Sequence, residues 1–150
     1  MRKETLKSIA ERSGISLVYL FGSRADEGKR YLEGEEIATN SYSDLDIAVA
    51  FERFPVETVQ VYGKLYREIS DLFDPFRIDL IFIHEMNSLF QYEIIKGEKI
   101  YERSVTFADD FEEGVMKRAG DLIYKKRIFD RDVLEAMEHG YFEFEYVPNP

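Results

Sequence analysis

The stretch that decides the fold is "YSDLDIAVAF", residues 42–51. Its apolar run, 47–51, is typical of a buried β-strand, yet two carboxylates, Asp44 and Asp46, stand at its beginning. Because side chains of a strand alternate between faces, the two carboxylates lie on one face. An unpaired carboxylate beside a core is costly. The two carboxylates therefore either lie in solvent at the beginning of the strand or bind a positively charged group.

A second predicted strand, "RIDLIFIH" (77–84), also carries a carboxylate near its beginning. Ile78, Leu80 and Phe82 share one face, which places Asp79 on the other. If the two strands are neighbours, three carboxylates converge and repel one another strongly. A divalent cation relieves this repulsion, and Mg²⁺ favours one or two carboxylates together with waters and substrate phosphates. The pattern favours a two-metal site for phosphoryl or nucleotidyl transfer.

The segment "FGSR", residues 21–24, supplies a complementary half of such a site. It follows an apolar strand predicted over 15–21, and a turn there can offer backbone N–H groups to a triphosphate. Gly22 lets the backbone approach closely, Ser23 can donate from its hydroxyl, and Arg24 can neutralise phosphate charge. The segment thus predicts a nucleotide-binding turn.

The rest of the chain alternates helical and strand patterns, which indicates a mixed α/β fold with a small sheet covered by helices. Apolar residues at helical spacing predict helices over 3–14, 55–73, 87–97, 107–129 and 130–140. A last short strand is expected near 99–103. Residues 25–43 are polar and glycine-bearing, so we expect a long loop with little fixed structure, of the kind that often serves function.

Composition bounds the class of protein. The 150 residues, 45% of them hydrophobic, suffice for one compact domain with a core. The absence of cysteine excludes disulfides, thiolate metal sites and cysteine nucleophiles. No apolar run reaches the length of a membrane span, and no secretory signal is visible, so we expect a cytoplasmic protein. The net charge of −10 opposes binding to nucleic acid.

Taken together, "LFGSR … SDLDIAV … RIDLIFI" resembles the minimal nucleotidyltransferases of the DNA polymerase β-like superfamily, and most of all the MntA antitoxins of HEPN–MNT toxin–antitoxin pairs. The resemblance covers most of the chain, since "YEIIKGEKIYER" is similar to the family's closing segment and longer members add a helical extension. It implies an α/β (α+β) polymerase β-like fold. The nucleotidyltransferase domain would occupy 1–104, with a helical extension over 105–150 packed on it.

The resemblance also implies roles for the motif residues. On the matching positions, Asp44 and Asp46 would bind both of two Mg²⁺ ions, with Mn²⁺ as an alternative. Asp79 would be the third ligand and a candidate base for the attacking hydroxyl, while Gly22 and Ser23 would hold the triphosphate. ATP would be the substrate, and AMP would pass to a protein hydroxyl, namely a tyrosine of a HEPN-domain toxin that is thereby silenced.

One departure from the family leaves alternatives open. Twenty residues, 24–43, separate Ser23 from Asp44, whereas the family has a spacer of ten. Extra loop length costs little free energy, but it leaves base selection and acceptor docking open, and the loop could occlude the site. The chain could instead be an antitoxin that blocks its partner by contact without catalysis. It could also modify a small hydroxylated molecule such as an aminoglycoside, with a dimer interface supplying the pocket. A homo-oligomer and a hetero-oligomer are both open.

Two other features have ordinary structural interpretations. His84 and His139 are too far apart in sequence to indicate a histidine metal site, and His84 is expected to be a surface or capping residue. The aromatic residues of the tail, 141–146, are interpreted as a packed tail or as an interface with a partner.

Overall fold

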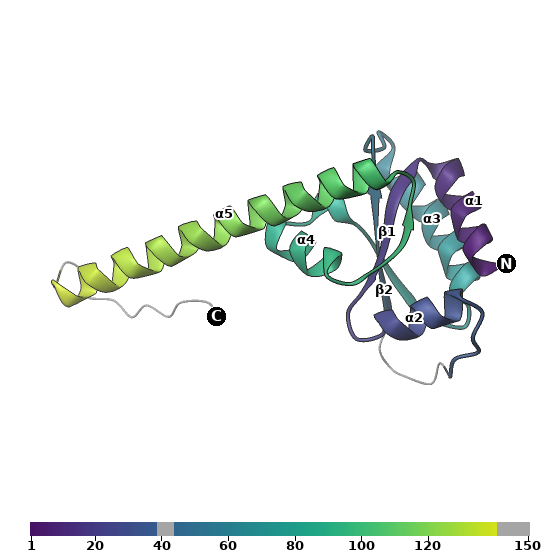
Figure 1. Cartoon of the computed structure of the whole chain (residues 1–150), viewed down its shortest axis with the longest axis horizontal. Helices are drawn as coiled ribbons and strands as arrows, with labels where there is room; N and C mark the ends of the chain where they lie inside the picture. Colours follow the sequence, from purple (N-terminus) through teal and green to yellow (C-terminus); the bar gives the residue numbers. More distant parts are fainter. Residues whose placement is uncertain (39–43, 141–150) are drawn as a thin grey trace.

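The computed structural model describes residues 1–38 and 44–140 of the chain (Figure 1). Our expectations for residues 39–43 and for the tail 141–150 lie outside this part. The described helices are α1 (Arg2–Ser13), α2 (Ala25–Leu32), α3 (Thr58–Phe73), α4 (Ser88–Ile95) and α5 (Val105–Glu138). The strands are β1 (Ile15–Phe21), β2 (Leu45–Phe51), β3 (Ile78–Phe82) and β4 (Glu98–Glu102), with a short 3₁₀ turn, η1 (Ile83–Glu85), after β3. The predicted α/β class with a small sheet is confirmed.

The sheet is mixed and has the strand order β3-β2-β1-β4. Strands β2 and β3 are parallel, whereas β1 runs antiparallel to both β2 and β4. As a result, the end of β1 and the beginnings of β2 and β3 meet at one end of the sheet. The pairing joins Phe21 to Asp46 and Asp46 to Asp79 across three adjacent strands.

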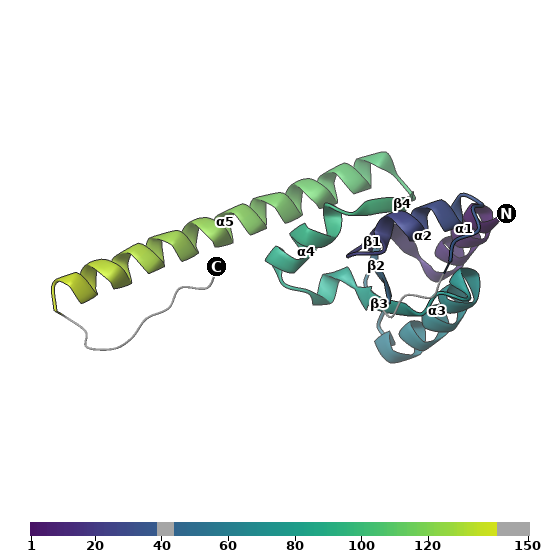
Figure 2. The same cartoon turned by 90° about the horizontal axis from the view of Figure 1, so that it is seen from below.

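Helices cover both faces of the sheet. Helices α1, α2 and α3 lie on one side, and α4 and the first half of α5 lie on the other (Figures 1 and 2). The core of the first side includes Leu6 and Ile69 of these helices against Ile47 of β2. On the second side, Ile94 and Ala108 pack near Tyr19 and the alanines of β2. The alternation of β2 therefore assigns Asp46 to the face of α4 and α5.

The expectation of a long unstructured loop over 25–43 is wrong for its first part, because α2 begins at Ala25. Polar residues dominate this segment, but Tyr31 and Leu32 are buried and anchor the helix in the core. Gly28 lies so close to the sheet that an added Cβ would meet Leu45 at 2.7 Å. Helices of this length are stabilised mainly by such tertiary packing, which local composition does not reveal.

The two helical segments predicted over 107–129 and 130–140 form one continuous helix, α5. It begins at a cap in which the Ser104 hydroxyl accepts a hydrogen bond from the Phe107 backbone N–H at 3.2 Å. Ala108, Val115 and Ala119 are buried, while the second half extends beyond the rest of the described chain (Figure 1). The division into a domain at 1–104 and an extension at 105–150 stays a prediction. Among the described helices, none is long and apolar enough to cross a membrane.

Candidate functional site

Two of the three predicted carboxylates face each other across neighbouring strands. Asp46 and Asp79 are register partners of the parallel pair β2–β3 and share one face of the sheet. Neighbouring strands lie roughly 4.8 Å apart, so the two side chains start from adjacent points. Asp44 precedes β2 by one residue, and its carboxylate lies 3.7 Å from Arg77 Nε in an exposed ion pair of small energetic value. The structure therefore brings Asp44, Asp46 and Asp79 to the same end of the sheet.

The proximity of the three carboxylates affects the pKa of Asp46. Burial raises the pKa of its carboxyl, and the nearby charges of Asp79 and Asp44 raise it further. All three influences act in the same direction, so in the protein alone the charge of Asp46 is opposed rather than stabilised. A positive group placed between the three carboxylates would reverse this balance. The donor set fits Mg²⁺, which prefers carboxylate oxygen.

The turn after β1 comes directly against Asp46. Gly22 has φ 76°, and a Cβ at this position would collide with the Asp46 carboxylate, so both conformation and space require glycine. Ser23 follows in an exposed position, and α2 begins two residues later. Backbone N–H groups at the beginning of a helix favour anions. The predicted nucleotide-binding turn and the carboxylates thus occupy one end of the sheet.

Arg24, the third residue of the predicted turn, has a different environment. The residue is only 4% exposed, and its Nη2 lies 2.8 Å from Glu27 Oε2 in an ion pair at the beginning of α2. The guanidinium also lies over the ring of Phe76, 4.8 Å from its centroid. The structure therefore places Arg24 in an internal cluster, and its assignment as a phosphate-neutralising residue stays a prediction.

Tyr62 of α3 is a neighbour of the site that sequence reasoning missed. Its hydroxyl donates a hydrogen bond of 2.7 Å to the Leu80 carbonyl oxygen on β3. Burial raises the pKa of Tyr62, and the charge of Asp79 raises it further. Tyr62 therefore fixes β3 next to Asp79. In the sequence, only the helical spacing of Tyr62 with Leu65 and Ile69 indicates that Tyr62 faces the sheet.

The carboxylates do not close on a single point in this structure. Within residues 1–38 and 44–140, no group of three or more His, Asp or Glu side chains is arranged to hold a metal ion. Assignment of Asp44, Asp46 and Asp79 as metal ligands is therefore a proposal, which rests on their common location and on the raised pKa of Asp46.

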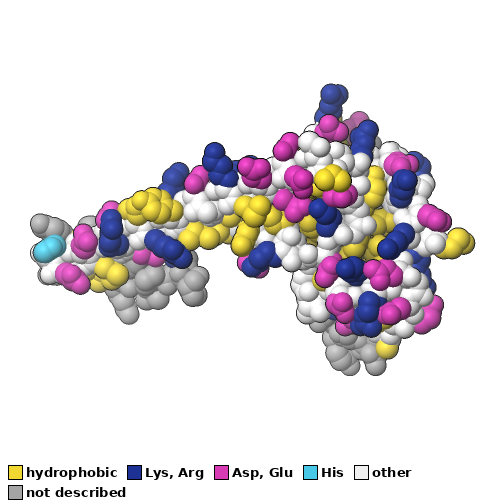
Figure 3. Space-filling view, viewed as in Figure 1, with side chains coloured by type: hydrophobic (Ala, Val, Ile, Leu, Met, Phe, Trp, Pro, Cys, Tyr) yellow, Lys and Arg dark blue, Asp and Glu magenta, His cyan; other side chains and the backbone are white. Residues whose placement is uncertain are grey.

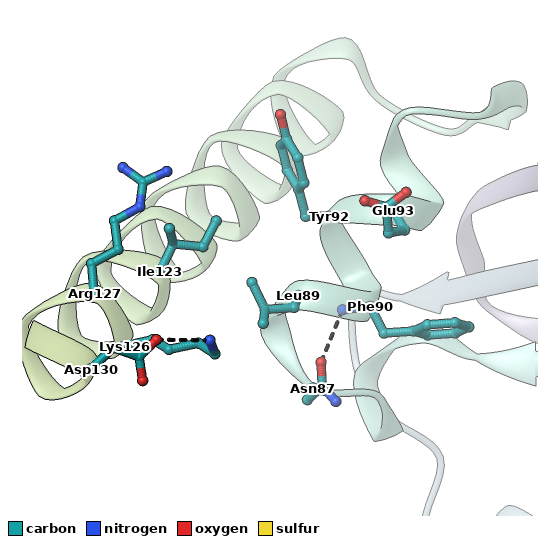
Figure 4. A pocket seen from close by; sticks show the side chains of 9 residues that line it. All are labelled: Asn87, Leu89, Phe90, Tyr92, Glu93, Ile123, Lys126, Arg127 and Asp130. Carbon is teal, nitrogen blue, oxygen red and sulfur yellow. Dashed lines mark hydrogen bonds and ion pairs between the residues drawn. The ribbon is translucent and has the colours of Figure 1, made fainter. Parts of the chain in front are cut away.

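A cavity of about 830 Å³ opens between α4 and α5, on the sheet face that carries Asp46 and Asp79 (Figure 4). Its lining residues come from both helices and are Asn87, Leu89, Phe90, Tyr92, Glu93, Ile123, Lys126, Arg127 and Asp130. The Phe90 ring points away from α5 and packs edge-to-face on Phe21, with 5.8 Å between ring centroids. Since Phe21 is the register partner of Asp46, the cavity flanks the carboxylates without containing them.

The surface mixes charges of both signs and has apolar patches along α5 (Figure 3). Exposed apolar side chains on the second half of this helix include Leu122, Ile123, Tyr124 and Leu134. Such side chains on a projecting helix are typical of surfaces that contact other proteins.

Comparisons with known proteins give a consistent result. Residues 4–106 match the family model described as "Polymerase beta, Nucleotidyltransferase", and this range contains all the candidate residues. No curated protein sequence matches the chain. Solved structures match over 89% of the chain at 14–15% identity, which shows a shared fold.

Three of these structures illustrate the likeness. One is a mutant of the toxin–antitoxin pair MntA–HpeT, with a TM-score of 0.63 and 99% of its chain covered. Another is the tri-AMPylated HEPN toxin of Shewanella oneidensis in complex with MNT antitoxin, with a TM-score of 0.59 and 96% covered. A third is a toxin–antitoxin with AMP-PNP, with a TM-score of 0.61 and 99% covered.

Proposed function

The chain belongs to the polymerase β nucleotidyltransferase family, and on this premise we propose that it is a Mg²⁺-dependent enzyme that transfers AMP from ATP to a protein hydroxyl. One observation carries the proposal: Gly22, Asp46 and Asp79 meet across three adjacent strands at one end of the sheet. This arrangement sets a phosphate-binding turn beside carboxylates whose mutual repulsion a metal would relieve.

Each residue has a defined task in this reaction. Asp44, Asp46 and Asp79 would hold the metal, which when bound neutralises phosphate charge and polarises the α-phosphate. Gly22 and Ser23 would hold the phosphates through backbone N–H groups and the serine hydroxyl. The acceptor oxygen forms a bond to the α-phosphorus, the bond to the bridging oxygen breaks, and pyrophosphate leaves with that electron pair. Asp79 would take the hydroxyl proton.

We assign the acceptor to a tyrosine of a HEPN-domain toxin, so that the chain acts as an antitoxin in the cytoplasm. Support comes from the solved structures of this fold, which include a tri-AMPylated HEPN toxin with its MNT antitoxin and a toxin–antitoxin with AMP-PNP. The cavity between α4 and α5 is the surface we assign to this toxin, because it flanks Asp46 through Phe90 and Phe21. A bound protein there can present its hydroxyl to the carboxylate end of the sheet.

A second function is an antitoxin that neutralises its toxin by contact alone. It is favoured by the absence, within the described residues, of three acidic or histidine side chains already gathered around one point. In that case the carboxylates would serve only a regulatory nucleotide site, or none.

The deciding experiment uses ATP labelled at the α-phosphate, Mg²⁺, the full chain and the HEPN toxin. We expect covalent label on the toxin with the wild type and none with Asp44→Asn. Asp71→Asn, which removes an exposed carboxylate of α3 outside the proposed ligand set, is the matched control and should transfer label normally. If the wild type transfers no label yet binds and silences the toxin, the contact mechanism replaces the catalytic one.

A further inference from the structure

We propose that Arg24 is a positioning residue that holds together the three chain segments of the candidate site, and that it does not bind the phosphates itself. The proposal rests on the proposed nucleotidyltransferase function and assigns a role to a residue that the reaction scheme above leaves without one. We call the group formed by Arg24, Glu27, Phe76 and the Ala38 carbonyl the Arg24 clamp.

The contacts of the clamp come from three separate segments. Arg24 Nη2 lies 2.8 Å from Glu27 Oε2 and 3.5 Å from the Ala38 carbonyl oxygen. Its guanidinium carbon lies 4.8 Å from the centroid of the Phe76 ring. Arg24 is 4% exposed and Phe76 is 3% exposed, so the stacking contact is shielded from water, whereas the Glu27 side chain is 35% exposed. One side chain therefore connects α2, the chain after α2 and the chain before β3.

Two of the three segments adjoin residues of the candidate site, and the third precedes Asp44 in the chain. Arg24 itself follows Ser23, Ala38 lies before Asp44 in the chain, and Phe76 comes three residues before Asp79. A second link reinforces the connection, because the hydroxyl of Tyr31 on α2 donates a hydrogen bond of 2.6 Å to the Asp74 carbonyl oxygen. Displacement of the guanidinium would thus let the phosphate-binding turn and the carboxylates move relative to one another.

The chemistry of arginine explains why this residue type fits the clamp. A guanidinium forms ion pairs and hydrogen bonds in its plane while its face stacks on an aromatic ring, whereas a lysine ammonium has no such face. The Glu27 carboxylate compensates the charge of Arg24, and only the Arg24 side of this pair is buried. Removal of Glu27 would leave the buried guanidinium without this compensating charge.

The two roles of Arg24 predict opposite effects of Glu27→Gln. If Arg24 is a clamp, loss of Glu27 releases the guanidinium and weakens nucleotide binding. If Arg24 is a phosphate ligand, loss of Glu27 removes a competitor for its charge, and binding stays the same or becomes tighter. Titration calorimetry of the full chain with AMP-PNP and Mg²⁺ separates the two.

We expect Arg24→Met and Glu27→Gln each to weaken AMP-PNP binding by about tenfold, because small displacements of positioned groups are costly. The double variant should be no weaker than either single variant, since the two residues act as one unit. Arg24→Lys should not restore binding. The controls are Arg30→Met and Asp26→Asn, which break an exposed ion pair of 3.0 Å on the same helix and should leave binding unchanged. Unchanged or tighter binding by Glu27→Gln overturns the clamp.

A measurement without nucleotide separates the clamp from the proposed function. Hydrogen exchange of the backbone amides should become faster together at 22–24 and at 76–79 in Glu27→Gln and Arg24→Lys, with α5 unchanged in each. Uniformly unchanged exchange at these two segments overturns the clamp, whatever the nucleotide result. If the wild-type chain binds no AMP-PNP but the two variants show the expected faster exchange, the result contradicts the proposed function and supports the clamp.

Discussion

Asp46 of β2 and Asp79 of β3 are direct register partners in a parallel strand pair, on the sheet face covered by α4 and α5. Two carboxylates in this relation oppose each other's ionisation, and the pKa of Asp46 is raised by burial and by this neighbour. Such an arrangement costs stability in the protein alone. It becomes useful when a cation binds between the side chains.

Asp46→Asn should therefore stabilise the metal-free protein. At pH 7 the asparagine removes a charge that burial and Asp79 oppose, so we expect the Tm to rise by about 2–4 °C, which corresponds to ~1 kcal/mol for a chain of this size. The same substitution should abolish stabilisation by Mg²⁺ with AMP-PNP. Thermal unfolding with and without these ligands measures both effects.

The stability gained by Asp46→Asn should depend on pH. Because the folded pKa of Asp46 exceeds the ordinary value of 3.8, the folded state binds more protons between the two values, and stability falls as pH rises through the folded pKa. The advantage of Asp46→Asn should be full above that pKa and shrink as the pH falls toward 3.8. A lower Tm for Asp46→Asn at pH 7 would show that the ionised carboxylate stabilises the fold.

Gly22→Ala should damage the site more than the fold. An alanine at φ 76° costs about 1–2 kcal/mol, and its Cβ would displace the Asp46 carboxylate. We expect a lower free energy of unfolding by this amount and no detectable AMP transfer. Urea unfolding and the labelled-ATP reaction provide the two measurements.

Gly63→Ala is the matched control for this substitution. Gly63 lies inside α3 with open space around its Cα, so alanine there should raise the free energy of unfolding by about 0.5–1 kcal/mol and leave transfer unchanged. If both variants kept normal transfer, the tight contact between Gly22 and Asp46 would have no part in the reaction.

The strands were predictable because buried strands carry continuous apolar runs. The range 15–21 agrees with β1, and the apolar run 47–51 falls within β2. Helix α2 was not predictable in the same way, because only Tyr31 and Leu32 of a polar segment reach the core. The prediction of two helices over 107–129 and 130–140 was wrong, because no proline or glycine occurs over 121–139 to interrupt a helix, so α5 continues through the expected break.

Side-chain alternation along the strands made part of the candidate site predictable. The faces of Asp46 and Asp79 follow from the sequence, but their pairing required the assumption that the two strands are neighbours, which the structure confirms. The burial of Arg24 was not foreseen. Its partner Glu27 lies three residues away, which signals an ion pair only once a helix is expected there.

His84 should make the fold sensitive to acid. Its Nε2 lies 3.0 Å from the Phe51 backbone nitrogen and 2.9 Å from the Phe51 carbonyl oxygen. Burial lowers the pKa of His84, although the Phe51 hydrogen bond acts in the opposite direction.

The direction of this pH effect on stability follows from how many protons His84 binds in the folded and unfolded states. Below the ordinary value of 6.5 the unfolded chain binds more protons at His84 than the folded chain does, so stability should fall as the pH drops from 7.5 to 5.5. Urea unfolding at these pH values should show the loss in the wild type and a smaller loss in His84→Gln. An equal loss in both chains would mean that His84 is not the group responsible.

Ile123→Asp should separate partner binding from nucleotide binding. Ile123 lines the cavity between α4 and α5, so a carboxylate there would be desolvated by a bound protein. We expect at least about tenfold weaker binding to the HEPN toxin, since the loss of one buried apolar contact costs more than 1 kcal/mol at such surfaces. AMP-PNP binding, measured by calorimetry, should stay at the wild-type value.

Leu122→Asp is the control for this prediction. Leu122 is 42% exposed, compared with 37% for Ile123, and it does not line the cavity. Equal toxin binding by the two variants would move the toxin to another surface of the chain and leave the proposed chemistry at the carboxylates untouched.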